Sequence, residues 1–131
     1  EHIGKIIRNM SFKGGNANTQ FSSLEMQIVQ DADRLDAIGA IGIARAFNYG
    51  GFKNRAMFDP NISPQMDMSP EEYRKSSAPT INHFYEKLLL LKDKMNTHTG
   101  KLLAEQRHQF MENFLTQFFA EWNGKKYEMK E

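Results

Sequence analysis

Residues 30–47, QDADRLDAIGAIGIARAF, place three carboxylates directly before a segment made almost entirely of Ala, Ile and Gly. On an α-helix Asp33 and Asp36 share a face, whereas Asp31 points away from them. Two carboxylates at the edge of a buried helix suit the binding of a divalent cation, or of a water beside one. The alternative is a solvated helix start, whose acidic residues favour the positive end of the helix dipole. Spacing alone leaves both interpretations open.

The composition of the 131-residue chain predicts one domain and limits its partners. The chain has 17 Lys and Arg and 16 Asp and Glu, which give a net charge of +1. This charge is too small to indicate binding of a nucleic acid polymer. The chain lacks cysteine, which excludes a disulfide framework and a cysteine nucleophile and suits a cytoplasmic protein. The longest apolar run, residues 37–44, is far shorter than the roughly 20 residues of a membrane span. We therefore expect a cytoplasmic protein without a membrane or nucleic acid partner.

Apolar residues at helical spacing predict an all-α fold, because no alternating strand pattern occurs. The first helix should end before SFKGG at residues 11–15. The second should begin after Ser22 or Ser23 and run without a break through Gly42 to the stop signal NYGG at residues 48–51. Gly39 and Gly42 each weaken a helix by about 1 kcal/mol relative to Ala. We expect another helix or a ligand to approach closely there.

The second half of the chain predicts one long loop and two amphipathic helices. Residues 52–79 hold all four prolines, and we expect a mobile surface loop in which Ser69 and Pro70 begin a short helical turn. A functional loop is the alternative. Residues 96–100 read as a turn between the two helices. Their apolar stripes predict packing rather than a cofactor site: Ile81, Phe84, Leu88, Leu91 and Met95 in one, and Met111, Phe114, Leu115, Phe118, Phe119 and Trp122 in the other.

Three blocks of the sequence closely resemble the C-terminal half of small bacterial HD-domain phosphohydrolases: residues 1–15, residues 23–51 and residues 83–124. The string DADRLDAIGAIGIAR, at residues 31–45, is the most specific part. The resemblance implies an all-α, HD-domain-like helical bundle over residues 1–131. It also implies a metal held by a His, a His-Asp pair and a later Asp, which activates water for attack on a phosphoryl group. The later Asp lies in the segment that reads ADRLD here, which points to Asp33 as the metal ligand, with Asp31 as the competing assignment.

The family's first His and its His-Asp pair belong to helices upstream of the matched part. This chain has no His-Asp dipeptide, and its four histidines, His2, His83, His98 and His108, do not supply that pattern. We expect the chain to begin partway through a longer protein, whose N-terminal helices would bring those ligands. The same helices would cover the apolar faces of residues 37–47 and 111–122.

Several cationic and polar residues are candidates for binding a phosphorylated substrate, each with an ordinary structural alternative. Lys13, beside two glycines, suits phosphate contact but also suits a solvated loop. Arg34 could reach a substrate phosphate or pair with a nearby acid. Arg45, with Tyr49 one turn on, could clamp a polyphosphate or cap the negative end of its helix. Lys87 could face a pocket or solvent. His108 is expected to pack, and His2 is a weak candidate for an extra ligand.

Together these inferences predict a metal-dependent phosphohydrolase in the full-length parent, acting on a nucleotide. The narrower expectation is hydrolysis of a nucleoside triphosphate to the monophosphate and pyrophosphate. We expect Asp33 and Asp36 to be catalytic and Mn²⁺ or Mg²⁺ to be the cofactor. The alternative function is a non-catalytic helical module that binds a nucleotide or a protein. The sequence leaves the oligomeric state open, with a homo-oligomer among the alternatives.

Overall fold

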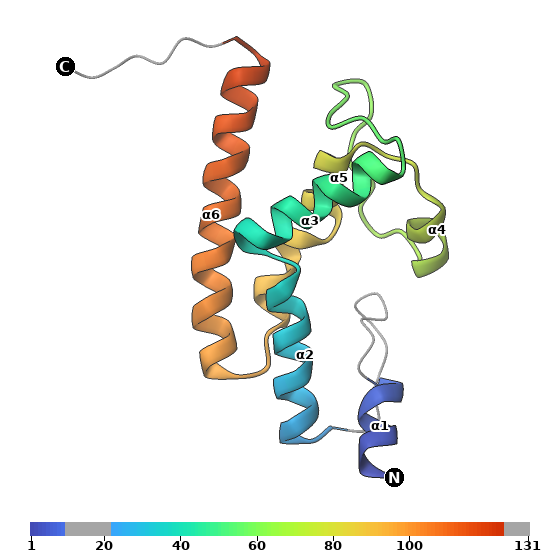
Figure 1. The fold of residues 1–131 in the computed structure, drawn as a ribbon, viewed down its shortest axis with the longest axis vertical. Helices are drawn as coiled ribbons and strands as arrows, with labels where there is room; N and C mark the ends of the chain where they lie inside the picture. The colour runs from blue at the N-terminus through green and yellow to red at the C-terminus, as the bar shows by residue number, and fades with distance from the viewer. Residues whose placement is uncertain (10–21, 125–131) are drawn as a thin grey trace, which may run out of the picture.

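The computed structural model describes residues 1–9 and 22–124, and these residues form helices and loops without a strand (Figure 1). The predicted all-α class is therefore confirmed for this part of the chain. The longest helix, α6 (His98–Trp122), runs along one side of the molecule, and α2 (Leu24–Asp36), α3 (Gly39–Phe52) and the 3-10 helix η1 (Leu88–Lys94) pack against it. The elements in chain order are α1 (His2–Asn9), α2 (Leu24–Asp36), α3 (Gly39–Phe52), α4 (Pro70–Lys75), α5 (Thr80–Glu86), the 3-10 helix η1 (Leu88–Lys94) and α6 (His98–Trp122).

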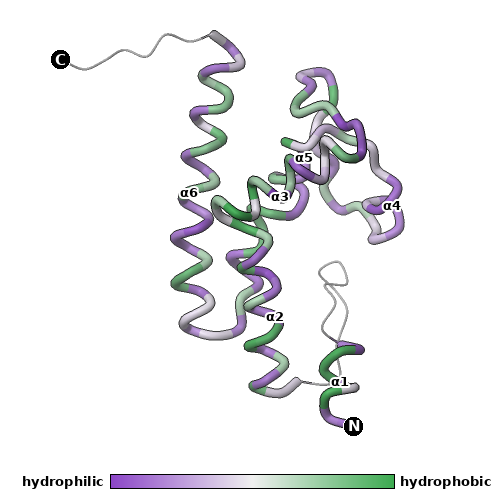
Figure 2. The backbone as a smooth tube through the Cα atoms, viewed as in Figure 1, coloured by the Kyte–Doolittle hydropathy of each residue, from purple (hydrophilic) through white to green (hydrophobic). Residues whose placement is uncertain are grey.

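The prediction of one continuous helix from residue 24 to residue 51 is wrong, because the chain turns sharply between α2 and α3. Gly39 begins α3 with a φ of +75°, a value that residues with a side chain rarely adopt. The Arg107 side chain of α6 lies against it, 3.0 Å from where a Cβ would stand, and donates a hydrogen bond to the Leu35 carbonyl at 2.6 Å. Hydrophobic residues gather at this corner (Figure 2).

The close approach expected at the two glycines is present, but only Gly39 meets another helix. At Gly42 the neighbour is the backbone of Ala37, whose carbonyl would overlap with any Cβ. Gly42 therefore allows α3 to fold back against the residues that immediately precede it.

The apolar stripe predicted over residues 81–95 is buried as expected, but it lies on two elements instead of one helix. The α-helix stops at Glu86, Lys87 takes a φ of −142°, and the chain continues as η1. In a 3-10 helix residues three apart share a face, so Leu88 and Leu91 still point into the core. The expected turn at residues 96–100 is shorter than predicted, because Thr97 caps α6 and the helix begins at His98. The buried core comprises Ile38, Ile43, Ile81, Phe84, Leu88, Leu91, Met95, Ala104, Met111 and Leu115.

The aromatic residues predicted to pack do so around Phe47 of α3. Its ring centroid lies 5.9 Å from the centroids of both Phe84 and Phe114. Phe58, from the loop after α3, contacts Phe119 and Trp122 edge-on at 5.1 and 5.4 Å. Aromatic pairs at such separations add stability beyond their burial, so they hold α3, α5 and the loop against α6.

The loop over residues 53–79 is hydrogen-bonded to the start of α5. Two backbone N–H groups at the start of α5, on Thr80 and Ile81, donate to the carbonyls of Ala56 and Met57 at 2.9 and 3.0 Å. These bonds satisfy N–H groups that a helix start otherwise leaves without partners. The predicted helical turn is α4, where Ser69 forms a capping box with Glu72 and Pro70 takes the first position.

Some apolar side chains remain exposed, among them Ile41 at 65% and Trp122 at 47%. They lie on α3 and α6, the two helices whose apolar faces were predicted to need further helices to cover them. Within the described part of the chain, no helix combines the length and apolar character that a membrane span requires.

Candidate functional site

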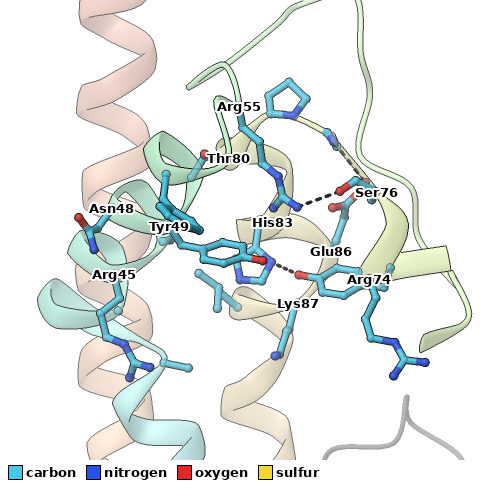
Figure 3. A pocket seen from close by; sticks show the side chains of 18 residues that line it. Arg45, Asn48, Tyr49, Arg55, Arg74, Ser76, Thr80, His83, Glu86 and Lys87 are labelled. Carbon is cyan, nitrogen blue, oxygen red and sulfur yellow. Dashed lines mark hydrogen bonds between the residues drawn. The ribbon is translucent and has the colours of Figure 1, made fainter. Parts of the chain in front are cut away.

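A pocket of about 740 Å³ opens between α3, α4 and α5 (Figure 3). Its walls come from the second half of α3, from α4 and the residues after it, and from one face of α5. The side chains that can bind a ligand by charge, hydrogen bond or ring stacking are Arg45, Asn48, Tyr49, Phe52, Arg55, Tyr73, Arg74, Ser76, Thr80, His83, Glu86 and Lys87.

Positive charge dominates this pocket. Four cationic side chains line it, those of Arg45, Arg55, Arg74 and Lys87, against the single carboxylate of Glu86. Glu86 already accepts a hydrogen bond from the Gln65 backbone N–H at 2.9 Å. Guanidinium groups present paired donors that match phosphate oxygens, and ammonium groups add a point charge. The pocket is therefore suited to an anionic ligand with several phosphate or carboxylate oxygens.

Arg55 owes its position to the turn that ends α3. Asn54 takes a φ of +55°, which Asn tolerates better than most residues, and the Arg55 N–H then donates to the Gly50 carbonyl at 2.9 Å. This turn folds Arg55 back over the Tyr49 ring, with 5.3 Å between the guanidinium carbon and the ring centroid. The guanidinium also donates to the Ser76 carbonyl at 2.9 Å (Figure 3). Arg55 thus joins the end of α3 to the end of α4.

Tyr73 of α4 and His83 of α5 form a hydrogen-bonded pair inside the pocket. Burial, and after it the charges of Lys87 and Arg55, lower the pKa of His83 from 6.5 to about 4. The imidazole is therefore neutral at pH 7, and the tautomer with its proton on Nε2 accepts the Tyr73 O–H at Nδ1. The pair holds α4 to α5 without adding a charge to the pocket.

Arg45 lies at the pocket edge in an ion pair with Asp36, the last residue of α2. The same guanidinium lies 3.4 Å from the Asp36 carbonyl, so it also meets the negative end of α2. Both side chains are about three-fifths exposed, at 61% and 62%. Arg45 therefore caps the end of α2, not of its own helix as one alternative predicted, and it lines the pocket as well.

Of the residues predicted to bind substrate, the structure brings Arg45, Tyr49 and Lys87 together in this pocket. Arg34 does not reach it, because its guanidinium donates to the Lys94 carbonyl at the end of η1. Lys13 falls outside the described residues. The sequence-based reasoning missed Arg55, Tyr73, Arg74 and His83. The available signal was the group of cations, Lys53, Arg55, Arg74 and Lys75, that accompanies Tyr73 within the Pro-containing loop.

The three carboxylates of the opening segment have different surroundings. Asp31 is 3% exposed and accepts hydrogen bonds from Asn96 and Thr97, at the start of α6. Burial opposes its charged form, but the bonds from Thr97 and Asn96 outweigh that effect, so the pKa of Asp31 lies below its usual value. Asp33 is exposed, and no described residue pairs with it. The Asp31 carboxylate therefore joins α2 to the start of α6, whereas the Asp33 carboxylate is exposed to solvent.

The described residues do not by themselves fit a Mn²⁺ or Mg²⁺ site. Nowhere among them do three His, Asp or Glu side chains gather closely enough to hold a metal ion. His108 packs as expected, 6% exposed with Nε2 at 2.9 Å from Glu112 Oε1, and its Nδ1 has no hydrogen-bond partner among the described residues. Asp33 could supply one ligand, and such ions need several oxygen or nitrogen ligands.

Comparison with known proteins places the chain among HD-like helical structures, although no family model matches it. A Lactobacillus plantarum protein of known crystal structure is 51% identical, with a TM-score of 0.84 over 94% of this chain and 58% of its own. An HD-superfamily hydrolase from Bacillus thuringiensis is 56% identical, with a TM-score of 0.66 over 79% of this chain and 48% of its own.

YpgQ of Bacillus subtilis is 44% identical over 118 residues, which make up 89% of this chain and 50% of YpgQ. The crystal structure of YpgQ in complex with ADP matches with a TM-score of 0.59 and 43% identity, over 73% of this chain and 43% of that chain. The chain thus spans about half the length of the curated relative that it matches. The predicted HD-domain-like, all-α fold is confirmed by these similarities.

Proposed function

We propose that the full-length protein is a metal-dependent phosphohydrolase that acts on a nucleotide, and that the pocket between α3, α4 and α5 binds that nucleotide. The observation that carries the proposal is the pocket itself, with four cations, two tyrosines and one carboxylate. Two similarities of this chain to proteins of known structure support the proposal. One is to an HD-superfamily hydrolase, and the other is to YpgQ, which has been crystallised with ADP.

The pocket offers separate surfaces for the two parts of a nucleotide. Arg45, Arg74 and Lys87 present cationic groups that neutralise phosphate oxygens, including the charge that develops when a phosphoryl bond breaks. Tyr49, which is 51% exposed, offers a ring on which a base can stack. We further propose a nucleoside triphosphate as substrate, with the monophosphate and pyrophosphate as products.

Mn²⁺ or Mg²⁺ is the cofactor that we propose, on the resemblance of the ADRLD segment to the metal-binding segment of HD-domain phosphohydrolases. Asp33 would supply one ligand, and the remaining ligands would come from residues other than those described. The assignment of Asp36 as catalytic also stays a prediction. Its ion pair with Arg45 supports a role in holding that guanidinium at the pocket edge.

A binding measurement with matched lysine variants tests the pocket. We expect isothermal titration of the full-length protein to detect ATP binding, and Lys87→Ala to weaken it about tenfold, the value of one charged hydrogen bond. Lys101→Ala, on the exposed face of α6 outside the pocket, should leave ATP affinity unchanged. Equal affinities for the two variants would place nucleotide binding elsewhere.

The absence of a three-residue metal cluster from the described part of the chain favours a second candidate function, a helical module that binds a nucleotide without hydrolysing it. Binding of ATP without any hydrolysis by the full-length protein, with Mn²⁺ or Mg²⁺ present, would support this candidate.

A further inference from the structure

The short helix α4 is positioned by contacts that belong to the pocket. It has six residues, and none of them is buried. Isolated helices shorter than about 12 residues are marginal in water, so α4 depends on its capping box and on bonds to its neighbours. Two such bonds join it to the rest of the pocket: Tyr73 to His83, and the Ser76 carbonyl to Arg55.

The direction of Arg74 follows from the bond made by Tyr73. Successive residues of an α-helix point about 100° apart, so fixing Tyr73 against His83 also fixes the direction in which Arg74 leaves α4. In Figure 3 the guanidinium of Arg74, the ammonium of Lys87 and the guanidinium of Arg45 all lie on the same, lower side of the pocket. Arg74 belongs to α4, Arg45 belongs to α3, and Lys87 is the residue that follows α5.

Arg74 differs from the other two arginines of the pocket, Arg45 and Arg55, in having no partner within the described part of the chain. Arg45 pairs with Asp36, and Arg55 bonds to Ser76 and lies over Tyr49. Among the described residues, Arg74 forms no hydrogen bond or ion pair, although its neighbour Lys75 pairs with Glu71. An unpaired guanidinium in a pocket that holds other cations can attract an anion with several charges.

We propose that Arg74, held in place by the Tyr73–His83 pair, selects nucleotides by the number of their phosphates. This inference rests on the proposed nucleotide binding. A monophosphate can be neutralised by one or two of the cations, whereas a triphosphate carries enough negative charge for all three. Arg74 thus contributes most to the binding of a triphosphate. Tyr73 and His83 are positioning residues, because they act through Arg74.

The test is the affinity of the full-length protein and its variants for AMP, ADP and ATP, measured by isothermal titration. We expect Arg74→Ala to weaken ATP binding about tenfold, since a hydrogen bond to a charged group is lost. The loss should be smaller for ADP and less than about twofold for AMP, because fewer phosphates reach Arg74. Lys75→Ala removes the neighbouring charge of the same helix and should leave all three affinities unchanged.

The positioning role is tested by a double-variant cycle. Tyr73→Phe should weaken ATP binding in the wild-type background and have no further effect in the Arg74→Ala background, because the two residues act through one group. Equal losses for AMP, ADP and ATP in Arg74→Ala, an equal effect of Lys75→Ala, or additive effects in the cycle would overturn the inference. If no nucleotide binds to the wild-type protein, the proposed function fails first.

Discussion

The carboxylate of Asp31 accepts hydrogen bonds from the backbone N–H and the hydroxyl of Thr97, at 2.8 and 2.6 Å, and so joins α2 to the start of α6 across 66 positions of the chain. Asn96 adds bonds from its backbone N–H at 2.8 Å and from its side chain at 3.1 Å. Gly100 lies so close that any Cβ there would overlap the carboxylate. A charge buried at an apolar edge is thus stabilised by hydrogen-bond donors.

Asp31→Asn should destabilise the protein by about 2–4 kcal/mol, because an amide cannot accept from all these donors and leaves buried groups unsatisfied. Chemical denaturation of the full-length protein measures the change. Asp33→Asn, two positions away and exposed, is the matched control and should change stability far less. Equal effects of the two variants would mean that Asp31 does not fasten α2 to α6.

Stability should fall as the pH is lowered from 7 to 5, in part because of His83. Its pKa is about 4 in the folded protein and 6.5 without the surrounding structure, so the unfolded chain binds the proton first. The contribution is present above pH 6.5 and decreases below it, by about 2 kcal/mol at pH 5. His83→Gln should remove this part of the pH dependence of the free energy of unfolding. An unchanged slope in the variant would show that His83 is not held neutral.

Two adjacent glycines of α3 should respond to alanine in opposite ways. Gly50 packs against Thr80 of α5, whose hydroxyl any Cβ would overlap, so Gly50→Ala should cost about 1–3 kcal/mol. Gly51 has open space around it, so Gly51→Ala should be neutral or stabilising by up to about 1 kcal/mol, as expected for a helical glycine. Thermal melts of both variants check the prediction. In a Thr80→Ala background the cost at Gly50 should shrink.

Arg45→Ala should affect ligand binding more than stability. The ion pair with Asp36 is largely exposed, and such pairs contribute at most about 1 kcal/mol. Loss of the guanidinium from the pocket should nevertheless weaken ATP binding, which isothermal titration measures. A variant that melts normally and binds ATP as tightly as the wild type would remove Arg45 from the binding set.

The sequence predicted the helical core because burial repeats with the helical period. Ile81, Phe84 and Leu88 are buried even though α5 gives way to a 3-10 helix between them, since spacings of three and four residues suit both helix types. The corner at Gly39 was not predictable from the local pattern. It depends on Arg107, which is distant in the chain and fills the space beside the glycine.

The pocket residues on a periodic helix could be predicted from the sequence, whereas those in the loop could not. Arg45 and Tyr49 lie on an apolar helix, so their polar groups could be recognised beside a predicted core. Arg55 and Arg74 come from the Pro-containing loop, where no periodicity indicates a direction. Their positions follow from a turn at Asn54 and from the bonds of α4 to α5, which appear only in three dimensions.

The most direct test of the central claim is the product of nucleotide hydrolysis by the full-length protein. The protein would be incubated with each nucleoside triphosphate and Mn²⁺ or Mg²⁺, and the phosphorus species would be followed by ³¹P NMR. We predict formation of a nucleoside monophosphate and pyrophosphate, lost in Asp33→Ala and on chelation of the metal, and retained in a variant such as Lys101→Ala. Binding of a nucleotide without release of any product, with either metal, would contradict the proposed phosphohydrolase activity.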